Sequence, residues 1–138
     1  MDFLSLPPLT YLEGGYDKIY DMLWVIVCRH SGLKKLIPIR KETTAKELCI
    51  LFVHYVYPNW GMPEDIVSDR DSKFTSKEFV DFCNYNYITQ SMSTSHHPET
   101  DGQTENANKQ ILQLIRAGTS NFNINWLAYG PLIEAAFN

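Results

Sequence analysis

Residues 65–71 (DIVSDRD) and residues 97–105 (HPETDGQTE) carry the pattern around which the rest of the chain is arranged. The first stretch is a short apolar run that ends at Asp69, which is typical of a buried strand that delivers a carboxylate at its carboxyl end. The second is a glycine-containing loop that opens a helix, with Glu105 near the helix start. Positions 70 to 104, which are 35 residues, separate these two acids. A third acid, Asp2, stands in the first apolar run of the chain.

Strands and helices are predicted along the whole length of 138 residues. Apolar runs predict five strands, at 1–6, 19–28, 33–39, 65–69 and 88–92. Residues 9–18, which contain Gly14-Gly15, are interpreted as a turn or loop, and residues 30–32 as a hairpin turn. Capping boxes at 44–47 (TAKE) and 75–78 (TSKE) open two helices, and two more are predicted, one after residue 103 and one over 125–137. The order favours one α/β domain with a mixed five-stranded sheet flanked by helices.

The helix that begins near Glu105 is predicted to have two unlike faces. At 100° per residue, its apolar face consists of Ala107, Ile111, Leu114 and Ile115. The opposite face consists of Glu105, Asn108, Lys109 and Arg116. The Glu105 carboxylate is therefore expected to face a cleft or solvent.

Charge and cysteine content limit the classes of function. The formal net charge is −4 and the sequence pI is about 5.5, which by itself argues against a nucleic-acid partner. A carboxylate metal site would add acidic groups and so weakens that argument. The three cysteines, Cys28, Cys49 and Cys83, form no CxxC pair, so they are interpreted as small buried apolar residues in a reducing compartment. No apolar run is long enough to predict a membrane span.

Three carboxylates at strand and helix ends suit a hard divalent cation. Mg²⁺ prefers oxygen ligands and takes one or two carboxylates together with water and phosphate oxygens. Two such ions can activate an attacking oxygen and stabilise the leaving oxygen of a phosphoryl transfer. Spacing alone makes this a weak prediction, because most of the 16 acidic residues are expected to be solvated.

The sequence closely resembles the integrase catalytic core of gypsy-like LTR retrotransposons, relatives of retroviral integrases. The resemblance rests on residues 67–71 and 97–105, on Asp2 with the following Leu6-Pro7, and on the 35-residue gap between the second and third acids. Shorter matches at 44–45, 51–52, 61–63 and Trp126 extend it over essentially all 138 residues. It implies a ribonuclease H-like fold in which Asp2, Asp69 and Glu105 are the catalytic residues and hold two Mg²⁺ or Mn²⁺ ions.

The resemblance also implies a reaction and its partners. Nucleotides are removed from the 3′ ends of element DNA, and the new 3′-hydroxyls then attack target DNA. The residues expected to contact DNA are Asn108, Lys109, His97 and Gln103. A homodimer or higher oligomer is expected, located in the nucleus, with a cytoplasmic stage during particle assembly.

Residues 1–138 are interpreted as the catalytic core alone, truncated at both ends. No His-His-Cys-Cys set of a zinc-binding domain precedes Asp2, and no basic tail of a DNA-binding domain follows Asn138. The fragment is therefore expected to be weak or inactive by itself. Two alternatives remain: a non-catalytic relic or host-adopted module that binds DNA or protein, and a ribonuclease H that cleaves RNA in hybrids. Integrase-type spacing of the third acid disfavours the second of these.

Overall fold

The computed structural model describes residues 1–13, 16–92, 106, 108–114, 134–135 and 138. The chain divides into two compact units. One contains Met1 and residues 42–102, and the other contains residues 2–41 and 103–138. None of the helices within the described ranges is long and apolar enough to cross a membrane.

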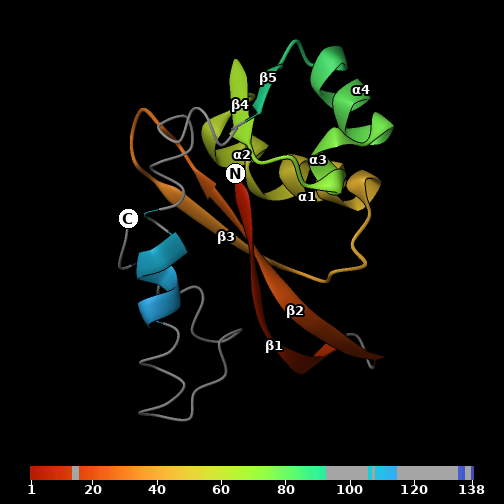
Figure 1. The fold of residues 1–138 in the computed structure, drawn as a ribbon, viewed down its shortest axis with the longest axis vertical. Coiled ribbons are helices and arrows are strands. Elements are labelled where there is room, and N and C mark those ends of the chain that lie inside the picture. The colour runs from red at the N-terminus through yellow and green to blue at the C-terminus, as the bar shows by residue number, and fades with distance from the viewer. Residues whose placement is uncertain (14–15, 93–105, 107, 115–133, 136–137) are drawn as a thin grey trace. The chain divides into compact units, whose positions relative to one another are not determined.

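An antiparallel sheet of three strands forms the second of these units (Figure 1). Its strands are β1 (Asp2–Glu13), β2 (Tyr16–Val27) and β3 (Lys34–Ile39), in that spatial order. A tight turn joins β2 to β3, in which the Cys28 amide donates to the Leu33 carbonyl oxygen at 2.8 Å. Gly32 has φ +74° there, a conformation that glycine adopts at little cost. The turn predicted at 30–32 is confirmed.

The loop predicted over residues 9–18 is wrong for residues 9–13 and 16–18, which belong to the paired strands β1 and β2, and residues 14–15 lie outside the described residues. The pairing of β1 with β2 extends from Asp2 opposite Val25 to Glu13 opposite Tyr16. The register shifts between Ser5 and Leu9, where β1 advances four positions and β2 only two. The Pro7-Pro8 pair falls in this irregularity, which is where a strand tolerates residues that lack an amide donor. The prolines therefore interrupt the ladder without ending the strand.

Apolar residues from all three strands and from the helix at 108–114 form the core of this unit. The cluster consists of Leu4, Leu6, Leu23, Val25, Leu36 and Ile111. Glu134 forms side-chain bonds with the edge strand β3. Its carboxylate accepts a hydrogen bond from the Leu36 amide at 2.9 Å and forms an ion pair with Lys35 at 3.1 Å. Such bonds occupy edge groups that would otherwise be open to another strand. Most of the helix predicted over 125–137 lies outside the described residues, and residues 134–135 are helical.

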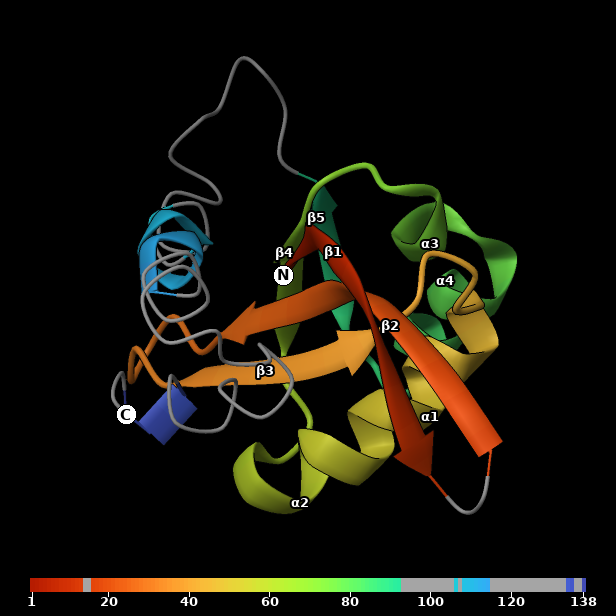
Figure 2. The ribbon, with the colours of Figure 1, turned by 90° about the horizontal axis from the view of Figure 1, so that it is seen from below.

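The other unit combines helices with two parallel strands (Figure 2). The elements, in chain order, are α1 (Ala45–Tyr55), α2 (Tyr57–Trp60), β4 (Asp65–Ser68), α3 (Ser72–Thr75), α4 (Lys77–Tyr85) and β5 (Thr89–Met92). Helix α1 contacts α2, α3 and α4, and α4 contacts β5. The Met1 amino group donates to the Val67 carbonyl oxygen at 2.7 Å. The five predicted strands are present, but among the described residues they pair as two sheets, an antiparallel sheet of three strands and a parallel sheet of two, where the sequence predicted one mixed sheet.

Side-chain caps set the helix starts of this unit. Thr44 caps α1 by accepting from the Glu47 amide at 3.2 Å, as predicted. The start predicted at Thr75 is one residue early, because Ser76 caps α4 through the Phe79 amide at 3.5 Å. Thr75 instead ends the short helix α3, which the sequence did not predict. Both caps satisfy amides that a helix start leaves without partners.

Candidate active site

Asp69 follows the carboxyl end of β4 directly. The end of a strand in a parallel sheet is where ligand-binding side chains gather in α/β folds. The Oδ1 atom of Asp69 accepts a hydrogen bond from the Asp71 amide at 3.0 Å, which fixes the orientation of the Asp69 side chain. Its Oδ2 has no hydrogen bond to the described residues, and the side chain is partly exposed. One carboxylate oxygen of Asp69 is therefore available to a ligand.

Asp71 has a different task from Asp69. Its Oδ1 accepts from the Lys73 amide at 2.9 Å and caps α3. Successive hydrogen bonds from Asp71 to Asp69 and from Lys73 to Asp71 make the segment after β4 a defined turn.

The periodicity of β1 places Asp2 on a specific face of its sheet. Side chains two positions apart share a face, so Asp2 lies on the same face as Leu4 and Leu6. The helix at 108–114 packs on that face through Ile111. Residues three apart share one side of a helix, which brings Asn108 toward Asp2. Asn108 Nδ2 donates to Asp2 Oδ2 at 2.9 Å, and the Phe3 amide donates to Asp2 Oδ1 at 2.8 Å.

The predicted polar face of this helix needs a correction at Asn108. Its side chain is only 8% exposed, whereas Leu114, predicted in the core, is 37% exposed. The buried stripe is thus rotated from Leu114 toward Asn108, with Ile111 fully buried between them. The sequence pattern missed this because it ranked positions by apolarity, and a half-buried carboxylate partner for an amide is not visible in periodicity.

The other predicted site residues divide into two groups. Lys109 is exposed, and its contact with DNA stays a prediction. Glu105, His97 and Gln103 lie outside the described residues. Within the described ranges, no three His, Cys, Asp or Glu side chains gather as a metal site would require. Asp2 and Asp69 offer hard carboxylate oxygens, and this donor chemistry suits Mg²⁺ or Mn²⁺.

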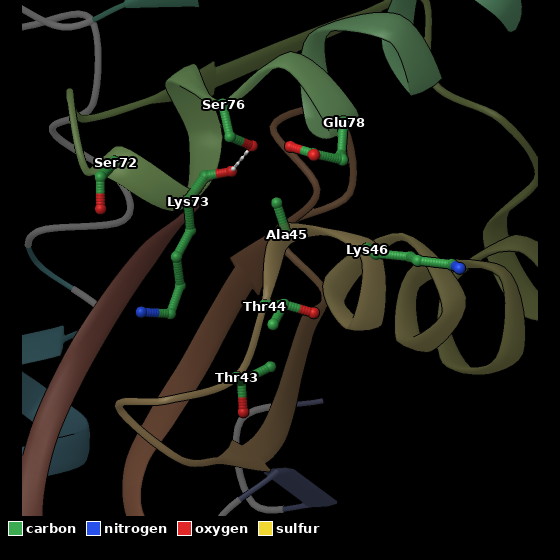
Figure 3. A pocket seen from close by; sticks show the side chains of 8 residues that line it. All are labelled: Thr43, Thr44, Ala45, Lys46, Ser72, Lys73, Ser76 and Glu78. Carbon is green, nitrogen blue, oxygen red and sulfur yellow. Dashed lines mark hydrogen bonds between the residues drawn. The ribbon is translucent and has the colours of Figure 1, made fainter.

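A pocket of about 480 Å³ lies beside the starts of three helices (Figure 3). Its lining comes from the segment that opens α1 and from α3 and the start of α4: Thr43, Thr44, Ala45, Lys46, Ser72, Lys73, Ser76 and Glu78. Ser76 donates to the Lys73 carbonyl oxygen at 3.1 Å across the α3–α4 junction. Hydroxyls and the Lys73 ammonium group favour an anionic group in such a place, whereas the Glu78 carboxylate opposes it. Sequence analysis identified the Thr44 cap but not this convergence.

Comparison with known proteins assigns the family. Residues 7–98 match the family described as Integrase core domain. The chain belongs to this family. It is also 33% identical, over its entire length, to the transposon Tf2-3 and Tf2-4 polyproteins of Schizosaccharomyces pombe. It spans 10% of the length of each of those polyproteins. The resemblance to integrase cores of LTR retrotransposons is thereby confirmed.

Solved structures of integrases share the fold. The simian T-cell lymphotropic virus intasome, in complex with a PP2A regulatory subunit, matches with a TM-score of 0.70 and 19% identity over 96% of this chain and 46% of that one. The HTLV-2 integrase catalytic core domain, in complex with magnesium in a dimeric form, matches with a TM-score of 0.65 and 22% identity over 96% and 82%. The predicted ribonuclease H-like fold of integrase catalytic cores is confirmed.

Proposed function

We propose that this chain is the catalytic core of a polynucleotidyl transferase that integrates DNA, through 3′-end processing followed by strand transfer. The proposal rests on one observation: Asp69 lies at the carboxyl end of β4 with one carboxylate oxygen available to a ligand. The chain belongs to the integrase core family, which gives this carboxylate its proposed role. Asp2 is its proposed partner on β1. On a helix, position 105 is one turn before position 108, so Glu105 is predicted on the side that Asn108 occupies.

The proposed cofactor is a pair of Mg²⁺ or Mn²⁺ ions held by Asp2, Asp69 and Glu105. The magnesium found with the HTLV-2 core domain supports the choice of metal. When bound, two such ions supply activation of the attacking oxygen and charge stabilisation at the leaving oxygen. The task of the protein is then to hold the carboxylates rigidly. The Phe3, Asn108 and Asp71 hydrogen bonds to Asp2 and Asp69 serve that task.

DNA is the proposed partner, as element ends and as target. An acidic chain needs local positive charge to bind phosphates. Lys73 and Lys46 at the pocket, and the exposed Lys109, supply it. Assembly as a dimer or higher oligomer is proposed from the dimeric HTLV-2 core and the viral intasome. Action on chromosomal DNA implies a nuclear location, after a cytoplasmic stage during particle assembly.

The test is a disintegration assay, in which the chain cuts and rejoins a labelled branched DNA in Mn²⁺. Asp69→Asn should reduce the rate at least about 100-fold, which corresponds to about 2.7 kcal/mol of transition-state stabilisation. Asp81→Asn is the matched control, because Asp81 is an exposed acid on α4. Metal-dependent cleavage at equal rates by both variants would contradict the proposal.

A further inference from the structure

We propose that Glu134 and Asn138 form an edge guard on β3, which prevents a second copy of this chain from adding its own β3 there as a further strand. Strand β3 is an outer strand of the antiparallel sheet, because the strand order is β1-β2-β3. An outer strand carries a row of main-chain donors and acceptors with which another strand can pair. The edge guard is independent of the proposed metal chemistry, and it restricts any assembly of copies to other faces of the chain.

Alternate residues of β3 point their main-chain groups away from β2. In an antiparallel pair, opposite residues alternate between hydrogen-bonded and non-hydrogen-bonded pairs. The amides of Lys34 and Leu36 donate to side chains outside the sheet, so positions 34, 36 and 38 form the outward set. Pro38 has no amide hydrogen. The outward amides of β3 are therefore those of Lys34 and Leu36, and both are occupied.

The Asn138 side chain pairs with β3 as a residue of a neighbouring strand would. Its Oδ1 accepts from the Lys34 amide and its Nδ2 donates to the Lys34 carbonyl oxygen, both at 2.8 Å. A side-chain amide offers the same kinds of donor and acceptor as a peptide group, and this two-way exchange is the bond pattern of an antiparallel pair. Asn138 thus takes the place that a residue of an added strand would need.

Glu134 closes the next outward position. Its Oε2 accepts from the Leu36 amide at 2.9 Å, and its Oε1 pairs with Lys35 at 3.1 Å. The two side chains of this ion pair are 22% and 24% exposed, and ion pairs close to solvent contribute little. A hydrogen bond from an amide to an ionised carboxylate is the stronger of the two contacts. The edge guard therefore depends on the bond to the Leu36 amide more than on the charge of Lys35.

One turn of helix spaces the two guard side chains to fit the strand. The Asn138 amide donates to the Glu134 carbonyl oxygen at 3.1 Å, which is the bond between residues four apart in an α-helix. Four helical residues rise about 6 Å and two strand residues about 6.6 Å, so the two side chains match successive outward positions of β3. Figure 2 shows the helical segment at 134–135, in dark blue, beside β3.

A second copy of this chain is the partner that the edge guard excludes. Two β3 edges that meet across a twofold axis run antiparallel and present the same residues to each other. Three of the six residues of β3 are Leu or Ile, and β-branched residues favour strand pairing. Pro38 removes one outward amide, but those of Lys34 and Leu36 would be enough for a pair of bonds. Proline alone therefore does not close this edge.

Amide hydrogen exchange tests the bonds within one chain. In the ¹⁵N-labelled protein, Glu134→Ala should speed exchange of the Leu36 amide about 10-fold or more, and Asn138→Ala should speed exchange of the Lys34 amide about 2–10-fold. Asp81→Ala removes the same charge as Glu134→Ala from an exposed position of α4 and should change neither rate. Unchanged exchange in folded alanine variants would show that the bonds are absent, which overturns the inference.

Sedimentation velocity tests the exclusion of a second copy. Glu134→Ala/Asn138→Ala should form larger species than wild type at the same concentration, with self-association strengthened about 10-fold or more by the freed main-chain groups. Lys34→Pro in that background removes an outward amide and no bond to β2, at the first residue of the strand, where proline is tolerated. It should restore wild-type sedimentation. Lys34→Ala removes the same side chain but keeps the amide, so the larger species should persist.

The outcomes decide between a guard and a simple anchor. If the folded double variant exchanges both amides quickly but sediments as wild type does, the two side chains only anchor the helical turn, and the inference is overturned. If it forms larger species that Lys34→Pro does not reverse, the new contact uses another face, which also overturns it. Circular dichroism reports folding, and if the double variant unfolds, the same comparisons apply to the two single variants, each of which opens one outward amide.

Discussion

Phe79 is a fully buried residue of the unit that contains helices α1 to α4. It is 0% exposed, with its ring centroid 5.4 Å from that of Phe74 and 6.1 Å from that of Phe82. Phe79→Ala removes these contacts and leaves a cavity, so the free energy of unfolding should fall by about 3–5 kcal/mol. Tyr85→Ala, at a side chain that is 86% exposed, should change it by less than about 0.5 kcal/mol. Urea denaturation of both variants gives the comparison, and equal losses would contradict this view of the core.

Two neighbouring tyrosines should respond in opposite directions to glycine. Tyr87 has φ +57° and is 92% exposed. Its backbone conformation costs about 1–2 kcal/mol for a residue with a side chain, and the exposed ring makes little packing contact that would offset this cost. Tyr87→Gly should therefore raise the free energy of unfolding by up to about 1 kcal/mol, after the entropy that glycine adds to the unfolded chain. Tyr85→Gly, at the last residue of α4, should lower it by about 0.5–1 kcal/mol. Chemical denaturation would contradict this account if Tyr87→Gly were the more destabilising change.

The three cysteines should differ in reactivity. Burial raises the pKa of the Cys83 thiol to about 12 and that of Cys49 to about 11. Hydrogen bonds from Ser31, chiefly from its side chain, lower the pKa of Cys28. A lower pKa gives more thiolate at pH 8, and thiolate is the reactive form. Iodoacetamide should label Cys28 first, as read by peptide mass spectrometry, and faster labelling of Cys83 would show that its burial is wrong.

At the scale of elements, the junction of α1, α3 and α4 should contribute to DNA binding. Lys73 lines the pocket at this junction, whereas Lys77, at the start of α4, does not. If a DNA phosphate binds there, Lys73→Ala should weaken DNA binding about fivefold at ~0.1 M salt. It should also reduce the slope of log K against log salt concentration by about 1. Lys77→Ala is the matched control in fluorescence anisotropy, and equal effects of the two variants would assign the change to net charge alone.

Elements were predictable where a local signal agreed with packing. The Thr44 cap and the turn at 30–32 depend on a few adjacent residues and were correct. The α4 start shifted from Thr75 to Ser76 because α3 occupies the preceding turn, where the Thr75 hydroxyl contacts the Asp71 and Ser72 carbonyl oxygens at 3.4 Å. Strand β1 was ended too early because a bulge absorbs Pro7-Pro8. Both misses come from context that lies beyond the local pattern.

At the scale of the whole molecule, the sequence predicted both the order of the elements and the family. The order came from apolar runs and helix caps, and the family from the motifs around the three acids and their spacing. Asp69 stands at a strand end, as its apolar run predicted. The partner of Asp2 was not predictable, because Asn108 is 106 positions away and its burial depends on how the helix at 108–114 rotates on the sheet. Sequence periodicity gives the face of a helix only to within about one residue, or 100°.

The central claim is that Asp2, Asp69 and Glu105 converge on divalent metal. Calorimetric titration of Mn²⁺ into the 138-residue chain tests it most directly, alongside Asp2→Asn, Asp69→Asn, Glu105→Gln and the control Asp81→Asn. The account predicts binding by wild type and Asp81→Asn, and its loss in each of the other three. Unchanged binding in any one of the three would remove that residue from the site, and equal binding in all five proteins would contradict the claim as a whole.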